Sequence, residues 1–140
     1  MDGVHTYKSE FSPDSTIMII TSDCPYYDTF EPKFQELGYG FLMPDQNTII
    51  IDGEKLIEEG GSSDLFKFIE AHEVGHILLK HDGPRSAEQE LEADLAAYII
   101  LDKYGYKDSI KMLLKNFKFR HNMKFKPELL DKVKNLIPEL

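Results

Sequence analysis

The sequence is poor in several features, and each shortage excludes a class of protein. Cys24 is the only cysteine, so the chain can form neither an internal disulfide nor a cysteine-based zinc cluster. The longest apolar runs, such as IMII and AAYIIL, are far too short to span a bilayer. The first residues, MDGVHTYKSEF, lack a basic stretch followed by an apolar one, so we expect no signal peptide. These features predict a soluble, cytoplasmic protein with no membrane partner.

Composition and charge favour one folded domain with a polarised charge distribution. The 140 residues are 41% hydrophobic and 11% aromatic, which suits a single domain over 1–140. Residues 1–101 hold 6 Lys and Arg against 20 Asp and Glu, whereas residues 102–140 hold 10 against 5. The basic and aromatic segment 111–126 can contact nucleic acid or an acidic partner. A solvated helix face is the commoner explanation for such a charge run, so nucleic acid is not the expected partner.

The order of patterns predicts an α+β fold, with strands mainly in the N-terminal half. Runs rich in β-branched residues predict strands at 15–23 and 47–52, and 38–44 would join the latter through a turn at Pro44-Asp45-Gln46. This indicates an antiparallel or mixed sheet of about three or four strands. Helical patterns are expected over 29–37, briefly over 54–61, then over 64–82, 86–103 and 108–117, and from Pro127.

Capping residues mark the ends of the expected helices. Thr29 is a plausible N-cap for the first helix, and Ser62 or Ser63 for the helix over 64–82, which Gly83-Pro84 would end. Ser86 with Gln89 three residues later forms a capping-box pattern, and Gly105 would stop that helix.

The motif HEVGH, residues 72–76, predicts a metal site with a general base. Positions four apart lie on one face of a helix, so His72 and His76 can bind one ion. Glu73 is rotated about 100° from His72, beside the ion, where it can take a proton from a bound water. Gly75 leaves room for a close neighbour. The alternative is a helix that simply carries two surface histidines.

The segment EQELEAD, residues 88–94, supplies the carboxylates that such a site needs. A catalytic zinc has three protein ligands and one open position. Glu90 can be the third ligand, and Asp94, one turn on, can accept the free N–H of a ligand histidine. Glu88 and Glu92 form a rival pair, and Glu92 remains an alternative ligand. Small residues at 93, 96 and 97 would let this helix pack closely on the histidine helix.

HEVGH followed closely by ELEAD resembles the gluzincin zinc metallopeptidases. The NTIIID strand, the HEVGHILLKH helix and the E-x-E-A-D helix more narrowly resemble the ImmA/IrrE family of small zinc peptidases. The resemblance covers about 45–103 and leaves a basic helical part over about 104–140. It implies a small zincin-like domain binding one zinc, a peptidase activity, and a helix-turn-helix repressor as substrate. The chain departs from the family at Ala96, where a phenylalanine is usual, and in the following IILDKYG.

The expected reaction is hydrolysis of peptide bonds in a protein substrate. Zinc on His72, His76 and Glu90 would lower the pKa of a bound water, and Glu73 would act as general base and then acid. Tyr98, His81 and His121 are candidates for a second oxyanion donor or a substrate contact. The resemblance also implies that NTIIID is an edge strand that pairs with extended substrate; a central core strand is the alternative.

Two other functions compete with the peptidase. One is a catalytically silent metal-binding domain that acts in regulation or interaction. The other is a factor that contacts a nucleic-acid-associated partner through 111–126, with a purely structural metal. A structural zinc site is usually closed by four ligands, mostly cysteine, and Cys24 alone cannot supply them. The peptidase is therefore the favoured function.

Overall fold

The structure is a computed structural model that describes residues 2–43, 47–81, 85–115, 119 and 127–137. The chain forms two compact units, residues 1–70 and 71–140, and the boundary falls within helix α3 (Ser63–Leu78). Strands occupy the first unit and helices dominate the second, which confirms the predicted α+β class. Among the described residues, no helix is both long enough and apolar enough to cross a membrane.

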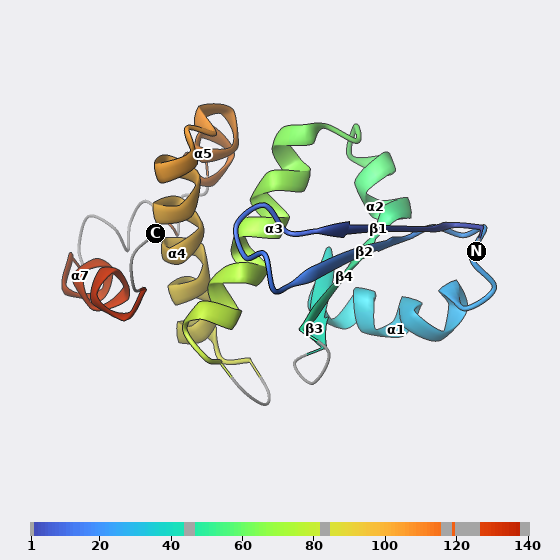
Figure 1. Cartoon of the computed structure of the whole chain (residues 1–140), viewed down its shortest axis with the longest axis horizontal. Helices are drawn as coiled ribbons and strands as arrows, with labels where there is room; N and C mark the ends of the chain where they lie inside the picture. Colours follow the sequence, from blue (N-terminus) through green and yellow to red (C-terminus); the bar gives the residue numbers. More distant parts are fainter. Residues whose placement is uncertain (1, 44–46, 82–84, 116–118, 120–126, 138–140) are drawn as a thin grey trace. The chain divides into compact units, whose positions relative to one another are not determined.

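The first unit is built on a four-stranded mixed sheet in the order β1-β2-β4-β3 (Figure 1). β2 runs parallel to β4, and the two outer strands pair antiparallel with their neighbours. The strands are β1 (Val4–Lys8), β2 (Thr16–Ile20), β3 (Gly40–Met43) and β4 (Thr48–Asp52). The β3–β4 hairpin is confirmed, although its predicted turn at 44–46 lies outside the described residues. β1 was not predicted, because most of its side chains are exposed and show no apolar alternation.

β4 is a central strand, so the expectation of an edge strand at NTIIID was wrong. It lies between β2 and β3, and all five of its residues are buried. The continuous apolar run TIII is typical of a strand covered on both faces, whereas a half-exposed edge strand alternates. The continuous apolar pattern of this run therefore favours an internal strand over an edge strand.

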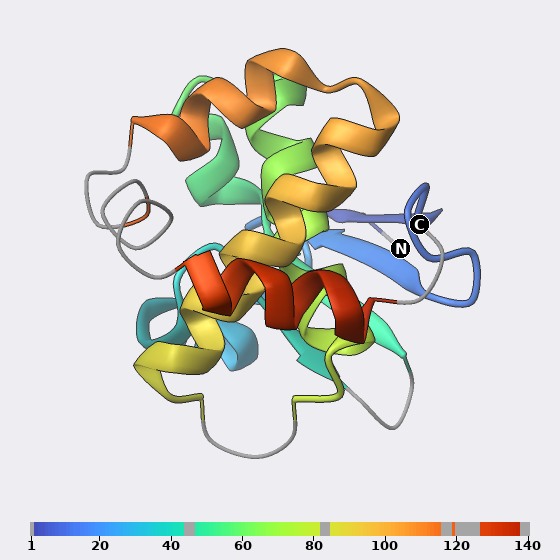
Figure 2. The ribbon, with the colours of Figure 1, turned by 90° about the vertical axis from the view of Figure 1, so that its left-hand side faces the viewer.

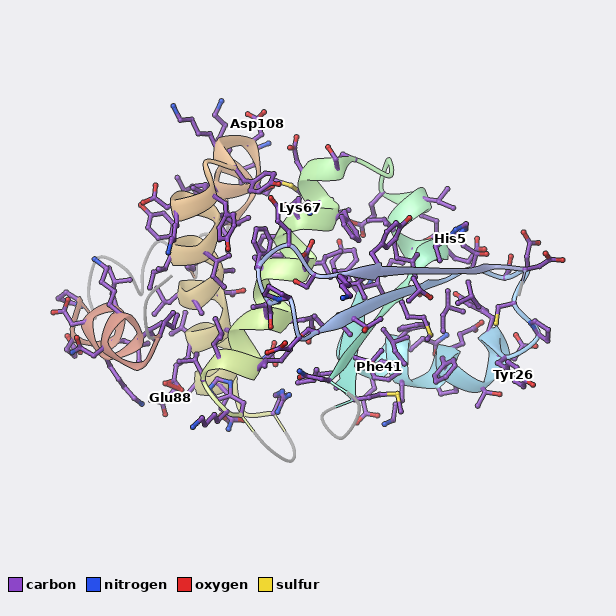
Figure 3. The ribbon with its side chains drawn as sticks, in the orientation of Figure 1. His5, Tyr26, Phe41, Lys67, Glu88 and Asp108 are labelled. Atoms are coloured by element: carbon purple, nitrogen blue, oxygen red, sulfur yellow. The ribbon has the colours of Figure 1, made fainter. Side chains whose placement is uncertain are left out.

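Helix α1 (Tyr27–Leu37) supplies aromatic side chains to the core of the first unit. The rings of Phe34 and Phe41 lie 5.5 Å apart, and both belong to a cluster with Ile20, Ile50 and Tyr27. Tyr26 at the start of α1 and Phe41 on β3 mark this part of the unit in Figure 3. The helix begins before Thr29, and Tyr26 is its N-cap, without a side-chain cap.

Asp52 links the sheet to the next helix, α2 (Gly53–Glu58). Its Oδ1 accepts hydrogen bonds from the backbone N–H groups of Glu54 and Lys55, which caps α2. The same oxygen accepts the hydroxyl of Tyr27 at 3.0 Å. One buried carboxylate thus joins β4, α2 and α1.

Glu70 anchors the segment after β1 to α3. Its side chain is fully buried and accepts hydrogen bonds from the Ser9 hydroxyl at 2.8 Å and the Glu10 N–H at 2.9 Å. Lys67 adds an ion pair at 3.0 Å. A buried carboxylate is costly unless its oxygens are satisfied, and three partners satisfy this one.

α3 begins as predicted but ends early. The Ser62 hydroxyl accepts the Leu65 N–H at 3.1 Å, so Ser62 is the cap. The helix stops at Leu78 rather than near residue 82, because Lys80 adopts a left-handed conformation with φ of 57°. The predicted stop at Gly83-Pro84 lies outside the described residues.

The second unit holds three further helices described by the structure: α4 (Ala87–Tyr104), α5 (Lys107–Leu114) and α7 (Pro127–Leu136). α4 contacts both α5 and α7, and α7 crosses it (Figures 1 and 2). Ser86 and Gln89 form the predicted capping box, and Gly105 ends α4 with a φ of 78°. Most of the basic segment, residues 116–118 and 120–126, lies outside the described part.

Candidate metal centre

Small residues let α3 and α4 approach closely at the HEVGH motif. A Cβ placed on Gly75 would lie 2.9 Å from the Cβ of Ala96 and 3.0 Å from the carbonyl oxygen of Ala93. Both distances are too short for a real side chain, so glycine is required for this packing. The predicted close contact between the two helices is confirmed, and it places the histidines of α3 beside the carboxylates of α4.

Three side chains converge in the way the sequence predicted. The Nε2 atoms of His72 and His76 lie 3.2 Å apart. The Glu90 carboxylate lies 3.0 Å from His72 Nε2 through one oxygen and 3.1 Å from His76 Nε2 through the other. A tetrahedral zinc with bonds of about 2.0–2.1 Å holds neighbouring ligand atoms roughly 3.3 Å apart. The observed triangle is close to that size, and this cluster could hold a metal ion.

Asp94 lies behind His72. Its Oδ1 is 2.8 Å from His72 Nδ1, while the other ring nitrogen belongs to the triangle. A metal on Nε2 leaves the proton of a neutral imidazole on Nδ1, which then donates to Asp94. This is the carboxylate–histidine arrangement that commonly supports metal ligands.

His81 lies behind His76 in a corresponding position. The Nδ1 atoms of the two rings are 2.8 Å apart. The left-handed turn at Lys80 folds the chain back, and the N–H of His81 donates to the His76 carbonyl at 3.0 Å. His81 therefore contacts the ring nitrogen of His76 that points away from the ligand triangle. Its predicted oxyanion or substrate role receives no support from this position.

Glu92 lies apart from the ligand triangle. One of its oxygens is 3.5 Å from His81 Nε2, and the other is 3.0 Å from the Lys132 ammonium on α7. Of the two rival carboxylates, the structure brings Glu90 to both histidines and turns Glu92 toward His81. The acidic spacing of α4 alone could not separate these two positions, because it does not reveal which face of α4 meets α3.

The two histidines have opposite electrostatic environments. Burial lowers the pKa of His76 to about 4. Burial also opposes protonation of His72, but the hydrogen bonds to Asp94 and Glu90 outweigh it and raise its pKa to about 10. Hydrogen bonds from both rings hold the pKa of Glu90 well below its usual value. The carboxylates around His72 thus favour positive charge at this position. A bound cation would supply that positive charge in place of the proton.

Glu73 is a buried acid that directly follows the candidate ligand His72 in the sequence. Burial raises its pKa to about 7, with a further rise from the charge of Glu90 and an opposing effect from His72. A carboxyl group with a pKa near neutrality can both accept and donate a proton. Tyr98 has its ring 6.3 Å from that of Phe119, and no contact of Tyr98 with the triangle is found among the described residues. His121 lies outside the described part.

The residues present therefore fit a divalent metal ion. They supply three ligand atoms of the nitrogen and oxygen type, and each ring carries a polar partner on its other nitrogen. The sequence is not significantly similar to any protein-family model or curated protein, and the structure is not significantly similar to any solved structure.

Proposed function

We propose that this protein is a zinc-dependent peptidase of the gluzincin type, resembling the small ImmA/IrrE enzymes. The observation that carries the proposal is the triangle of His72 Nε2, His76 Nε2 and the Glu90 carboxylate, with Glu73 adjacent on α3. Three protein ligands that leave a fourth position open are typical of catalytic zinc, whereas structural zinc is enclosed by four. His and carboxylate ligands accept several divalent metals, so zinc is part of the proposal.

Each residue has a distinct task in this proposal. When bound, zinc would act as a Lewis acid that activates water and polarises the scissile carbonyl. Asp94 holds the proton on His72 Nδ1 and orients the ring. Glu73, with its pKa of about 7, takes the proton of the attacking water and returns it to the leaving amine.

Metal content of the purified chain tests the site first. About one zinc per chain is expected, lost in Glu90→Ala and retained in Glu92→Ala at saturating zinc. The two substitutions remove the same group from the same helix, so each controls for the other. Absence of metal from wild-type protein dialysed after zinc loading would contradict the proposal.

Cleavage of an unfolded protein tests the chemistry. Casein incubated with the zinc-loaded chain should yield fragments detectable by mass spectrometry. Glu73→Gln should keep zinc but abolish cleavage, because glutamine cannot accept the proton. Equal cleavage by this variant would show that another group is the base. A helix-turn-helix repressor is the proposed natural substrate class by resemblance, and the same comparison applies to it.

A silent metal-binding regulatory domain is the second candidate, and burial favours it. His76 is 2% exposed and Glu73 8% exposed, whereas a peptide substrate must reach both the ion and the base. Zinc binding without cleavage of casein or peptide libraries would favour this candidate.

A further inference from the structure

A chain of four side chains runs from the candidate metal ligand His76 to helix α7. His76 Nδ1 lies 2.8 Å from His81 Nδ1, and His81 Nε2 lies 3.5 Å from one oxygen of Glu92. The second oxygen of Glu92 accepts the Lys132 ammonium at 3.0 Å. The chain thus connects α3, the segment after it, α4 and α7.

The hydrogen-bonding roles along this chain follow from the metal position. A metal on His76 Nε2 uses the lone pair of that nitrogen, so the ring proton is on Nδ1 and must be donated. His81 Nδ1 must then accept, which places the His81 proton on Nε2. That proton points to Glu92, which can only accept when ionised. Lys132 can only donate, so each contact pairs one donor with one acceptor.

Most of these four side chains are shielded from water by burial. The His81 and Glu92 side chains are each 8% exposed, and Lys132 is 51% exposed. A buried carboxylate needs partners for its charge, and Glu92 finds them in His81 and Lys132. Water cannot readily replace these partners at the buried end, so their loss would leave the His76 ring less constrained.

This series of hydrogen-bonded side chains differs from an ordinary ion pair between two helices, because it reaches a candidate metal ligand. A Glu92–Lys132 pair alone would only fasten α7 to α4. Here the pair continues through His81 to the back of a ligand ring, as Asp94 does directly for His72. The two ligand histidines therefore have different supports: a carboxylate for His72, and a neutral ring backed by an ion pair for His76.

We propose that His81 is a positioning residue for the metal ligand His76, and that Glu92 and Lys132 hold His81 in the accepting orientation. This inference rests on the proposed metal site. It assigns roles to the acidic residue that is not a ligand and to helix α7, whose Lys132 completes the support. Polar partners behind metal-ligating histidines typically contribute about 10–100-fold in metal affinity.

Zinc affinity of His81 variants tests the proposal. His81→Leu removes the acceptor, whereas His81→Asn keeps an oxygen near the position of Nδ1. The zinc dissociation constant, measured by competition with a chromophoric chelator, should rise by about 10–100-fold in the leucine variant. The asparagine variant should recover much of the loss. The visible spectrum of the cobalt-loaded proteins should change in the leucine variant, since it reports ligand geometry.

Variants of Lys132 and Glu92, at the other end of the hydrogen-bond chain, test the proposal without changing His81 itself. Lys132→Met should weaken zinc binding by a smaller factor, and Lys134→Met, at an exposed position on the same helix, should not. Glu92→Gln should likewise weaken binding, in contrast to Glu88→Gln one turn earlier; Glu88 lies at the N-terminal end of α4 (Figure 3). Urea midpoints of the metal-free proteins report any structural loss separately.

The outcomes distinguish this inference from the proposed function. Wild-type zinc affinity in both His81 variants would overturn the inference and leave the metal site standing. So would equal losses in the asparagine and leucine variants, because the accepting atom would then be irrelevant. Absence of zinc binding in wild type would overturn both. Zinc binding with the expected order of variants but no peptide cleavage would support the inference and contradict the peptidase.

Discussion

His72 and Asp94 lie on different helices, with 2.8 Å between Nδ1 of the ring and Oδ1 of the carboxylate. The ring of His72 therefore has both nitrogens engaged, one by Asp94 and the other by Glu90 at 3.0 Å. Rotation of the ring would break both contacts at once. The orientation of His72, the first candidate ligand, is thus set by α4 as well as by its own helix.

Removal of the Asp94 carboxylate should weaken metal binding without removing a ligand. Asp94→Ala is expected to raise the zinc dissociation constant by about 10–100-fold, because the ring loses its orienting partner. Asp94→Asn keeps an accepting oxygen and should cost less. The matched control is Asp102→Ala, an exposed position on the same helix. A wild-type dissociation constant in Asp94→Ala, measured by chelator competition, would rule out this role.

Zinc should stabilise the folded chain through the three ligands. A ligand that binds only the folded state at 100 times its dissociation constant adds about 2.7 kcal/mol to the free energy of unfolding. Wild-type protein should therefore gain stability in urea on zinc addition and lose it on chelation. Glu90→Ala should show little gain, whereas Glu92→Ala should retain a gain at saturating zinc. Equal gains in wild type and Glu90→Ala would place the metal elsewhere.

The packing of α3 on α4 should not tolerate a side chain at Gly75. Gly75→Ala places a Cβ 2.9 Å from the Cβ of Ala96 and 3.0 Å from the Ala93 carbonyl oxygen. Overpacking of this kind typically costs about 1–3 kcal/mol, and separation of the helices would also enlarge the ligand triangle. Urea unfolding and zinc affinity should both suffer. The double variant Gly75→Ala/Ala96→Gly removes one of the two clashes and should recover part of each loss.

The sequence predicted the cluster of His72, His76 and Glu90 because the features that bring these residues together are local in the sequence. His72 and His76 share a face whenever 72–76 is helical, and Ser86 with Gln89 fixes the start of the next helix. The small residues Gly75 and Ala96 indicated close packing, and the structure confirms it. Spacing and capping were sufficient for these features.

The features that were missed or wrongly predicted from the sequence depend on the tertiary fold. β1 has an exposed pattern and exists because it pairs with β2. The central position of β4 depends on the strand order. The early end of α3 depends on the left-handed conformation of Lys80, which could not be predicted because left-handed positions are usually occupied by glycine. The contact between His81 and His76 follows from that turn, so the periodicity of the sequence could not predict it.

Tyr27 should contribute stability at neutral pH that declines in alkali. Its hydroxyl donates to buried Asp52 at 3.0 Å, and burial together with this carboxylate raises the pKa of Tyr27 well above its usual value. Above about pH 10 the unfolded chain releases the tyrosine proton while the folded chain retains it. The free energy of unfolding therefore falls as the pH rises.

Tyr27→Phe separates the two contributions. At pH 7 it should lose about 1 kcal/mol, the typical worth of one hydrogen bond. Between about pH 10 and 11 the gap to wild type should narrow, because phenylalanine has no proton to release. Urea unfolding at each pH measures the gap, and Tyr26→Phe, at an exposed neighbour, controls for general alkaline effects. A gap that stays constant or widens with pH would mean that folding does not raise the pKa of Tyr27.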